Sequence, residues 1–128
     1  QKYETLIYAG ADFILLPSHH EPCGINQLIA MRYGCIPIVR KVGGLYDTVE
    51  NFHPATKRGT GFSFVQFDAF ALYGAIIRAL EIYKCEDIRQ RLVARVMQES
   101  NSWEIPAAKY IALYRQAIRR HVPRPIVS

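Results

Sequence analysis

Apolar residues gather into three short runs that divide the first half of the chain. The runs occupy residues 12–16, 36–40 and 61–65, and each is rich in residues that favour β-strands. Runs of this length are too short for helices, and strands covered on both faces of a parallel sheet are hydrophobic almost throughout. The pattern therefore predicts three parallel strands.

Segments with the helical spacing of apolar residues lie before, between and after these runs. We expect helices at residues 2–8, 25–33, 45–50, 68–83, 87–98 and 102–120. Asp68 and Ser102 are placed to cap their helices, and Pro106 falls in a first turn, where proline is tolerated. Strands that alternate with helices predict βαβ units with right-handed crossovers. The expected fold is a single α/β domain that ends in a helical tail from about residue 86.

The most polar junction in this pattern follows the first strand, where the chain reads PSHHEPCGIN. Ligands bind at the carboxyl ends of parallel strands, because strand-to-helix loops collect there and helix N-termini direct free N–H groups toward the crevice. Gly24 permits close backbone approach, and the N–H groups of Ile25 and Asn26 begin the helix, so we expect a phosphate here. A carboxylate beside a bound phosphate is electrostatically unfavourable, so we expect Glu21 to face sugar hydroxyls or a carbon that becomes positive in the transition state. The junction indicates a nucleotide-sugar site.

A second glycine-bearing junction follows the next strand, in the segment RKVGGLYDT. Gly43 and Gly44 precede a predicted helix, as Gly24 does after the first strand. Two adjacent loops of this kind could wrap one ligand. The alternative is ordinary turn chemistry, since neither a glycine pair nor one glycine at a helix start is specific by itself.

Three motifs in a fixed order carry a family resemblance: EPCGINQLIAMRYG, IPIVRKVGGLYDTV and GTGFSF. They resemble the bacterial glycogen synthases and plant-type starch synthases, and the resemblance extends to the Ser102-Trp103 pair. It implies a glycosyltransferase B fold, in which two Rossmann-like domains face a cleft. It also implies transfer of glucose from ADP-glucose to the non-reducing end of an α-1,4-glucan, with retention, without a metal and with no cofactor. Residues 1–128 would be the second half of the C-terminal, donor nucleotide-binding domain.

The resemblance also assigns roles to individual residues. Glu21 matches the glutamate beside the donor glucose, and the remaining matched positions belong to the binding site of the donor nucleotide and sugar: Cys23, Gly24, Ile25, Asn26, Gly43 and Gly44. A double displacement needs a second carboxylate, and the sequence offers none nearby, so a front-face mechanism with Glu21 stabilising an oxocarbenium-like transition state fits better. This chain departs from the family pattern at Ile25-Asn26, which replaces Leu-Thr, and at Lys41-Val42, which stands where a threonine is common.

Charge and cysteine content add little to this picture. The net charge of +5 and the pI near 9.3 suit an anionic ligand, but much of the excess lies near the C-terminus, and we expect neither a nucleic-acid nor a membrane partner. The three cysteines are odd in number and widely spaced, which predicts a reducing compartment, either bacterial cytoplasm or plastid stroma on the resemblance. The first residue is not Met, so we expect a piece of a longer protein that lacks its N-terminal domain, is inactive alone and self-associates through an unpaired sheet edge.

Simpler alternatives stand beside several of these interpretations. His19 and His20 with Glu21 and Cys23 could form a metal cluster, but neighbours on an extended loop point in opposite directions. Glu21 could be only an acid that the helix dipole favours. Helical spacing makes packing the first explanation of one set of tyrosines: Tyr73, Tyr83, Tyr110 and Tyr114. For the function, the rivals are a UDP-sugar transferase and a glucan- or polyanion-binding module that has lost its chemistry.

Overall fold

The computed structural model describes residues 2–99 and 102–121. Its sheet has three parallel strands in the order β1-β2-β3, namely β1 (Phe13–Leu16), β2 (Ile36–Arg40) and β3 (Phe62–Phe64). Phe13 pairs with Ile36, and Ile38 pairs with Phe62. The three predicted strands and their parallel pairing are confirmed.

The helices follow the predicted order with small changes at their ends. They are α1 (Lys2–Gly10), α2 (Asn26–Arg32), α3 (Gly44–Thr48), α4 (Ala69–Tyr83), α5 (Glu86–Gln98) and α6 (Glu104–His121). Asp68 caps α4 as predicted, because its side chain accepts hydrogen bonds from the N–H groups of Phe70 and Ala71. Helix α6 begins at Glu104, two residues after the expected cap Ser102, and Pro106 lies in its first turn.

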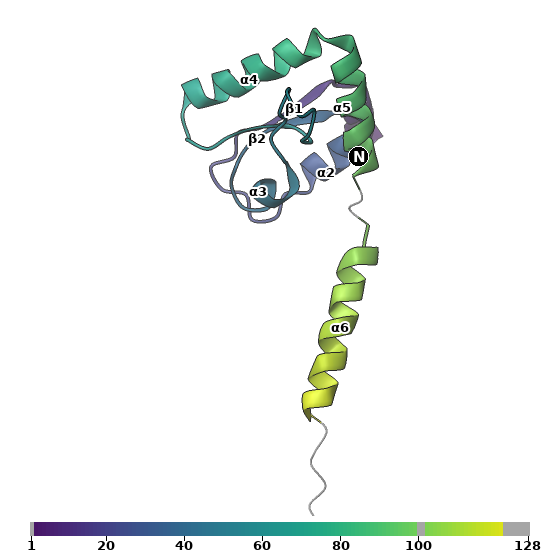
Figure 1. The fold of residues 1–128 in the computed structure, drawn as a ribbon. Helices are drawn as coiled ribbons and strands as arrows, with labels where there is room; N and C mark the ends of the chain where they lie inside the picture. Colours follow the sequence, from purple (N-terminus) through teal and green to yellow (C-terminus); the bar gives the residue numbers. More distant parts are fainter. Residues whose placement is uncertain (1, 100–101, 122–128) are drawn as a thin grey trace, which may run out of the picture.

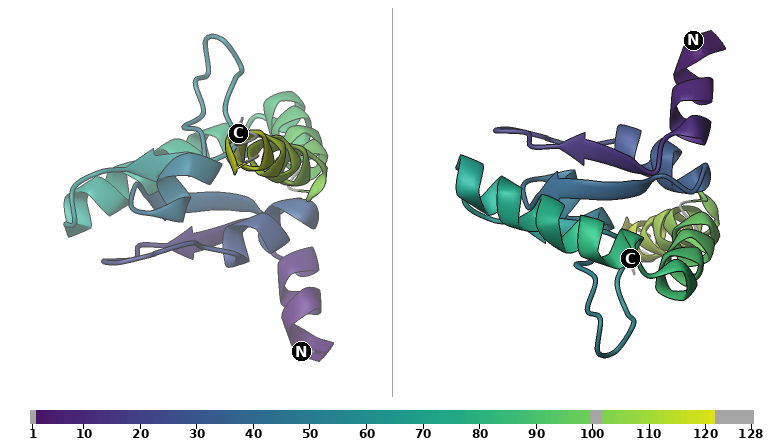
Figure 2. Two further views of the ribbon diagram at one scale, coloured as in Figure 1. Left: turned by 90° about the horizontal axis from the view of Figure 1, so that it is seen from below. Right: turned by 90° about the horizontal axis from the view of Figure 1, so that it is seen from above.

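Successive side chains of β2 point to opposite faces of the sheet and enter two different hydrophobic clusters. Ile36 and Ile38 pack in the larger cluster, together with Phe62 of β3 and buried residues of α4 and α5. Val39 faces the other way and packs against Leu45 of α3. Figure 2 shows α4 and α5 together on one side of the strands. A central strand covered on both faces explains why the run 36–40 is hydrophobic almost throughout.

The first and last described helices project from this body (Figure 1 and Figure 2). Helix α6 extends away from the sheet in Figure 1. In Figure 2, α1 projects on the side of the strands opposite α4. Tyr110 and Tyr114 on α6 are exposed, and so is Tyr73 on α4, which contradicts the expectation that these rings are packed. In the described ranges 2–99 and 102–121, no helix is both long and apolar enough to cross a membrane.

Candidate functional site

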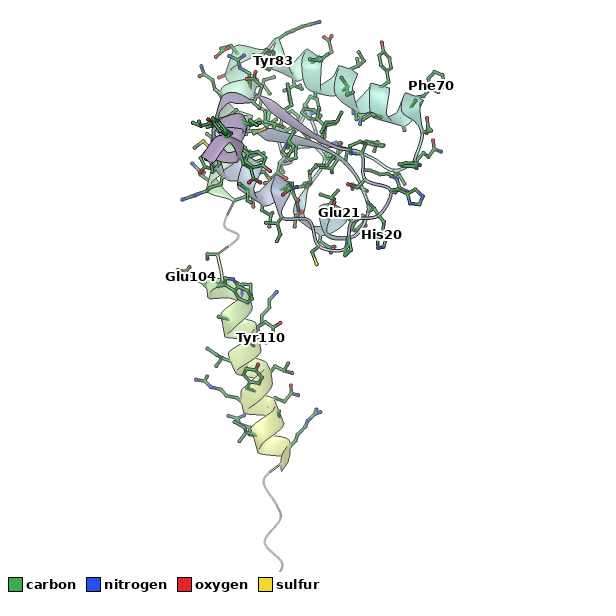
Figure 3. The ribbon with its side chains drawn as sticks, turned by 180° about the vertical axis from the view of Figure 1, so that it is seen from behind. His20, Glu21, Phe70, Tyr83, Glu104 and Tyr110 are labelled. Atoms are coloured by element: carbon green, nitrogen blue, oxygen red, sulfur yellow. The ribbon has the colours of Figure 1, made fainter. Side chains whose placement is uncertain are left out.

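A pocket opens where β1 ends and the chain turns into α2. Its volume is about 330 Å³, and its walls are Leu16 and the consecutive residues 21–27. Glu21 and His20 lie at this end of the body in Figure 3, while Tyr83 lies at the opposite end. The parallel strands all end on this side, so the pocket occupies the position where α/β sheets bind their ligands. The junction singled out from the sequence therefore forms a cavity.

The carboxylate of Glu21 is oriented by its own loop. Ser18 donates a hydrogen bond of 3.1 Å from its Oγ to Oε2 of Glu21. Arg40, at the end of β2, holds the same loop by donating from Nη1 to the carbonyl oxygens of Ser18 (3.3 Å) and His19 (3.0 Å). Its Nε donates to the Val65 carbonyl oxygen at 3.1 Å. One guanidinium thus ties the Glu21 loop to the ends of β2 and β3, which fixes the start of the pocket wall.

Gly24 stands at a tight backbone position in the pocket wall. Its φ is +68°, in the left-handed region that favours glycine. A Cβ there would lie 2.8 Å from both terminal atoms of the Gln27 side chain. The backbone conformation therefore favours glycine at this position, and a larger residue would displace the Gln27 amide.

Gly43 and Gly44 are packed directly against the loop that carries Glu21. A Cβ on Gly43 would lie 1.7 Å from the carbonyl oxygen of Glu21, and one on Gly44 would lie 1.6 Å from the carbonyl oxygen of Cys23. The N–H group of Gly44 donates a 3.2 Å hydrogen bond to the Glu21 carbonyl oxygen. This N–H group is already used, so the contact that the glycine pair makes within the protein is with the first loop. The structure brings the two glycine-bearing junctions together, but Gly43 and Gly44 are not among the residues that line the pocket.

The buried side-chain amide of Gln27 also connects these two loops. Nε2 of Gln27 donates to the Gly24 carbonyl oxygen at 2.9 Å and to Oγ1 of Thr48 at 3.0 Å. Oγ1 of Thr48 in turn donates to the Gly44 carbonyl oxygen at 2.7 Å. Gln27 is fully buried, and its Oε1 has no hydrogen-bond partner among the residues that the structure describes. A polar network therefore backs the part of the pocket formed by Gly24 and Gln27.

The sequence left open the roles of three residues, His19, His20 and Lys41, and two of them contact aromatic rings. The ring of His19 lies edge-on to Phe67, with centroids 4.8 Å apart, and His20 is exposed. Lys41 places its Nζ 5.2 Å from the ring centroid of Tyr46, within the range of a cation–π contact. No group of three potential metal ligands occurs within residues 2–99 and 102–121.

The cysteines differ in accessibility. Cys23 lines the pocket and is exposed, and Cys85 is exposed at the start of α5. Cys35 is buried before β2, and burial, aided by the negative charge of Asp12, raises the pKa of its thiol to about 11. The thiol that lines the pocket is therefore accessible, as is that of Cys85, whereas that of Cys35 is not.

Four residues of this arrangement were not singled out from the sequence. Ser18, Arg40, Gln27 and Thr48 act on the loops through hydrogen bonds, four of which join residues more than 20 positions apart. A local signal existed only for Gln27, a polar residue on the otherwise apolar face of a short helix. The others have ordinary loop and strand surroundings in the sequence, so pattern alone could not find them.

Comparisons with known proteins agree with the motifs. The chain matches the family model "Glycosyl transferases group 1" over residues 3–96. It is similar to the glycogen synthase of Lactococcus lactis subsp. lactis (strain IL1403), with 50% identity over 111 residues, which are 86% of this chain and 23% of that protein. The chain thus spans about a quarter of the length of the curated relatives it matches.

Solved structures show the same likeness. The catalytic domain of Arabidopsis thaliana starch synthase IV, a structure bound to ADP and acarbose, matches with a TM-score of 0.81 and 42% identity over 88% of this chain and 24% of that one. Sucrose-phosphate synthase from Thermosynechococcus elongatus matches with a TM-score of 0.65 and 31% identity over 93% of this chain and 28% of that one.

These matches extend over most of the strands and helices described above. They confirm the predicted fold, a Rossmann-like parallel sheet that forms part of the C-terminal domain of a glycosyltransferase B architecture. The family resemblance drawn from the three ordered motifs is confirmed as well. The chain belongs to the group 1 glycosyl transferases.

Proposed function

We propose that residues 1–128 form the second half of the C-terminal, donor-binding domain of an enzyme that transfers glucose from ADP-glucose to an α-1,4-glucan. The observation that carries the proposal is the pocket at the end of β1, where Glu21 is held by Ser18 at the rim of a cavity lined by residues 21–27. Support comes from the similarity to glycogen synthases and to a starch synthase structure bound to ADP and acarbose.

In this proposal different pocket residues contact different parts of the donor. The backbone of Gly24, Ile25 and Asn26, which lines the pocket at the start of α2, receives the distal phosphate. Glu21 faces the glucose, and Cys23 lies beside the donor. Gly43 and Gly44 belong to the same site and support the Glu21 loop from behind.

The proposed chemistry is a front-face retaining transfer. Among the described residues that line the pocket, Glu21 is the one carboxylate, whereas a double displacement needs two carboxyl groups about 5 Å apart. Glu21 would then stabilise positive charge as it develops on the glucose ring, while the leaving phosphate accepts the proton of the attacking glucan hydroxyl. The glucan and the N-terminal domain that presents it are the partners of the intact enzyme.

A second candidate is transfer from a different nucleotide sugar. The similarity to a sucrose-phosphate synthase, at 31% identity, favours considering this candidate, because one fold can serve several donors and acceptors. The described residues that line the pocket give no basis for telling adenine from uracil. A glucan- or polyanion-binding module without chemistry is less well supported, since the relatives are named as synthases.

Nucleotide titrations followed by NMR test the binding half of the proposal. ADP, UDP and ADP-glucose are added to the isotope-labelled chain, and backbone amide shifts are recorded. We expect saturable shifts at Gly24, Ile25 and Asn26 with ADP and ADP-glucose, and weaker ones with UDP. Equal shifts with UDP would favour the second candidate, and binding of maltooligosaccharide without any response to nucleotides would favour the glucan-binding module.

Substitution of Glu21 tests the chemical half. The chain replaces the matching segment of the Lactococcus lactis glycogen synthase, and glucose transfer from ADP-glucose is measured. We expect Glu21→Gln to lower kcat by about 100-fold or more, the typical loss when a preorganised electrostatic group is removed. Glu81→Gln is the matched control, because Glu81 is exposed on α4 and pairs with Lys84 away from the pocket. Near-normal turnover of Glu21→Gln would refute the role of Glu21.

A further inference from the structure

Four hydrogen bonds tie the loop of Glu21 to the glycine turn after β2. The Gly44 N–H group donates to the Glu21 carbonyl oxygen at 3.2 Å, and the Gly44 carbonyl oxygen accepts from Thr48 Oγ1 at 2.7 Å. Thr48 Oγ1 accepts from Nε2 of Gln27 at 3.0 Å, and the same nitrogen donates to the Gly24 carbonyl oxygen at 2.9 Å. The bonds run from Glu21 to Gly44, then through Thr48 of α3 and Gln27 of α2 to Gly24. Gly24 lies three residues after Glu21 in the first loop.

The polarity of these bonds fixes the orientation of the amide. The Thr48 hydroxyl gives its proton to the Gly44 carbonyl oxygen, so it can only accept from Gln27. The Gly24 carbonyl oxygen is also an acceptor. Both partners therefore require the NH₂ group of Gln27, and Oε1 must point the other way, where it is buried without a hydrogen-bond partner among the described residues.

A buried oxygen without a partner is costly, and an apolar side chain of similar size could fill the same space without that cost. Packing alone thus gives no reason for glutamine at this position. The two N–H bonds that Gln27 makes do give one, because they join the pocket wall to α3. Unfavourable features of this kind are tolerated mainly where they serve a functional site.

We propose that Gln27 and Thr48 are positioning residues, which hold the Glu21 loop against the Gly43-Gly44 turn and so set the place of the Glu21 carboxylate in the pocket. Gln27 is fully buried at the back of the pocket lining, and the Thr48 hydroxyl is occupied on both sides. Their effect passes through the Gly24 and Gly44 carbonyl groups. The catalytic consequence rests on the function proposed above, whereas the structural link does not.

Amide hydrogen exchange in the complete 128-residue chain tests the structural link without any ligand. Thr48→Val removes the hydroxyl and keeps the shape of the side chain, and Thr48→Ser is the matched control that keeps the hydroxyl. We expect Thr48→Val to speed exchange at the Gly44 N–H group about tenfold, the factor that the loss of one hydrogen bond gives. The Lys41 N–H group, bonded to the Phe64 carbonyl oxygen at 2.8 Å, should keep its rate.

Thr48→Ser should exchange like the unsubstituted chain, and Gln27→Met should exchange like Thr48→Val. Equal acceleration at Gly44 and Lys41 would mean general destabilisation and would overturn the proposal. No change at Gly44, or a serine variant that behaves like the valine variant, would overturn it as well. The threonine pair decides the question even if Gln27→Met fails to fold.

The catalytic consequence is measured in the chimera with the Lactococcus lactis enzyme. We expect Thr48→Val to lower kcat about tenfold while the KM for ADP-glucose and the Tm change little, because a misplaced Glu21 weakens the transition state more than donor binding. A fall in Tm with unchanged kcat would show a merely structural role. If the unsubstituted chimera transfers no glucose, the proposed function fails and the catalytic part of this proposal falls with it, while the exchange rates still decide the structural link.

Discussion

The Gly43-Gly44 turn offers the sharpest test of how the two loops fit together. In Gly44→Ala, the new Cβ would start 1.6 Å from the Cys23 carbonyl oxygen, although Cβ contacts under 3.0 Å essentially never occur. The neighbouring atoms are backbone and cannot rotate away, so the loops must separate, and the hydrogen bond from the Gly44 N–H group to Glu21 is lost. Overpacking costs about 1–3 kcal/mol and the lost hydrogen bond about 1 kcal/mol, so we expect a total loss of about 2–4 kcal/mol.

Gly74→Ala is the matched control for this substitution. Gly74 lies inside α4, and a Cβ there would meet only the Arg78 Nη1 atom, at 3.7 Å. Alanine is favoured over glycine in a helix interior by about 1 kcal/mol, so this variant should be more stable than the unsubstituted chain. Urea unfolding followed by far-UV circular dichroism measures both changes. If Gly44→Ala unfolded within about 0.5 kcal/mol of the unsubstituted chain, less than the cost of one hydrogen bond, the close packing of the loops would be refuted.

Three further predictions concern the cysteines and the cap of α4. Thiol reagents at pH 8 should label the exposed Cys23 and Cys85 and spare the buried Cys35, and mass spectrometry measures the labelling. Labelling of all three cysteines at one rate would contradict the burial of Cys35. Because the pKa of Cys35 is raised from 9.0 to about 11, the unfolded chain loses this proton first, so its contribution to stability is present below pH 9 and is lost as the pH rises to 11. Urea unfolding of Cys35→Ala should lack this component of the pH dependence. Asp68→Ala should lower the free energy of unfolding by about 1 kcal/mol because it removes the cap of α4, whereas Asp68→Asn should keep most of that stability. Equal losses in both variants would argue against capping.

Sequence pattern determined the regular elements of the fold. Strand propensity, helical spacing and capping are properties of neighbouring residues, so the three strands and the cap at Asp68 were predicted correctly. The strand pattern also located the pocket, because the carboxyl end of a parallel strand is fixed once the strand is known. The packing of the tyrosines was predicted wrongly for Tyr73, Tyr110 and Tyr114, since helical spacing indicates a shared face but not what covers it.

The connections between the loops were decided by the tertiary structure. Gly43 and Gly44 looked like a second ligand loop, and the structure places their backbone against Glu21 and Cys23. Arg40 holds a loop that lies more than 20 residues away in the sequence, and Gln27 bonds Thr48 over a similar separation. Such contacts depend on the pairing of β1 with β2 and on the path of the chain between them, and no local pattern encodes that distance. Residue types that chemistry requires can thus be found in the sequence, whereas the groups that hold them in place are found only where the chain has folded back on itself.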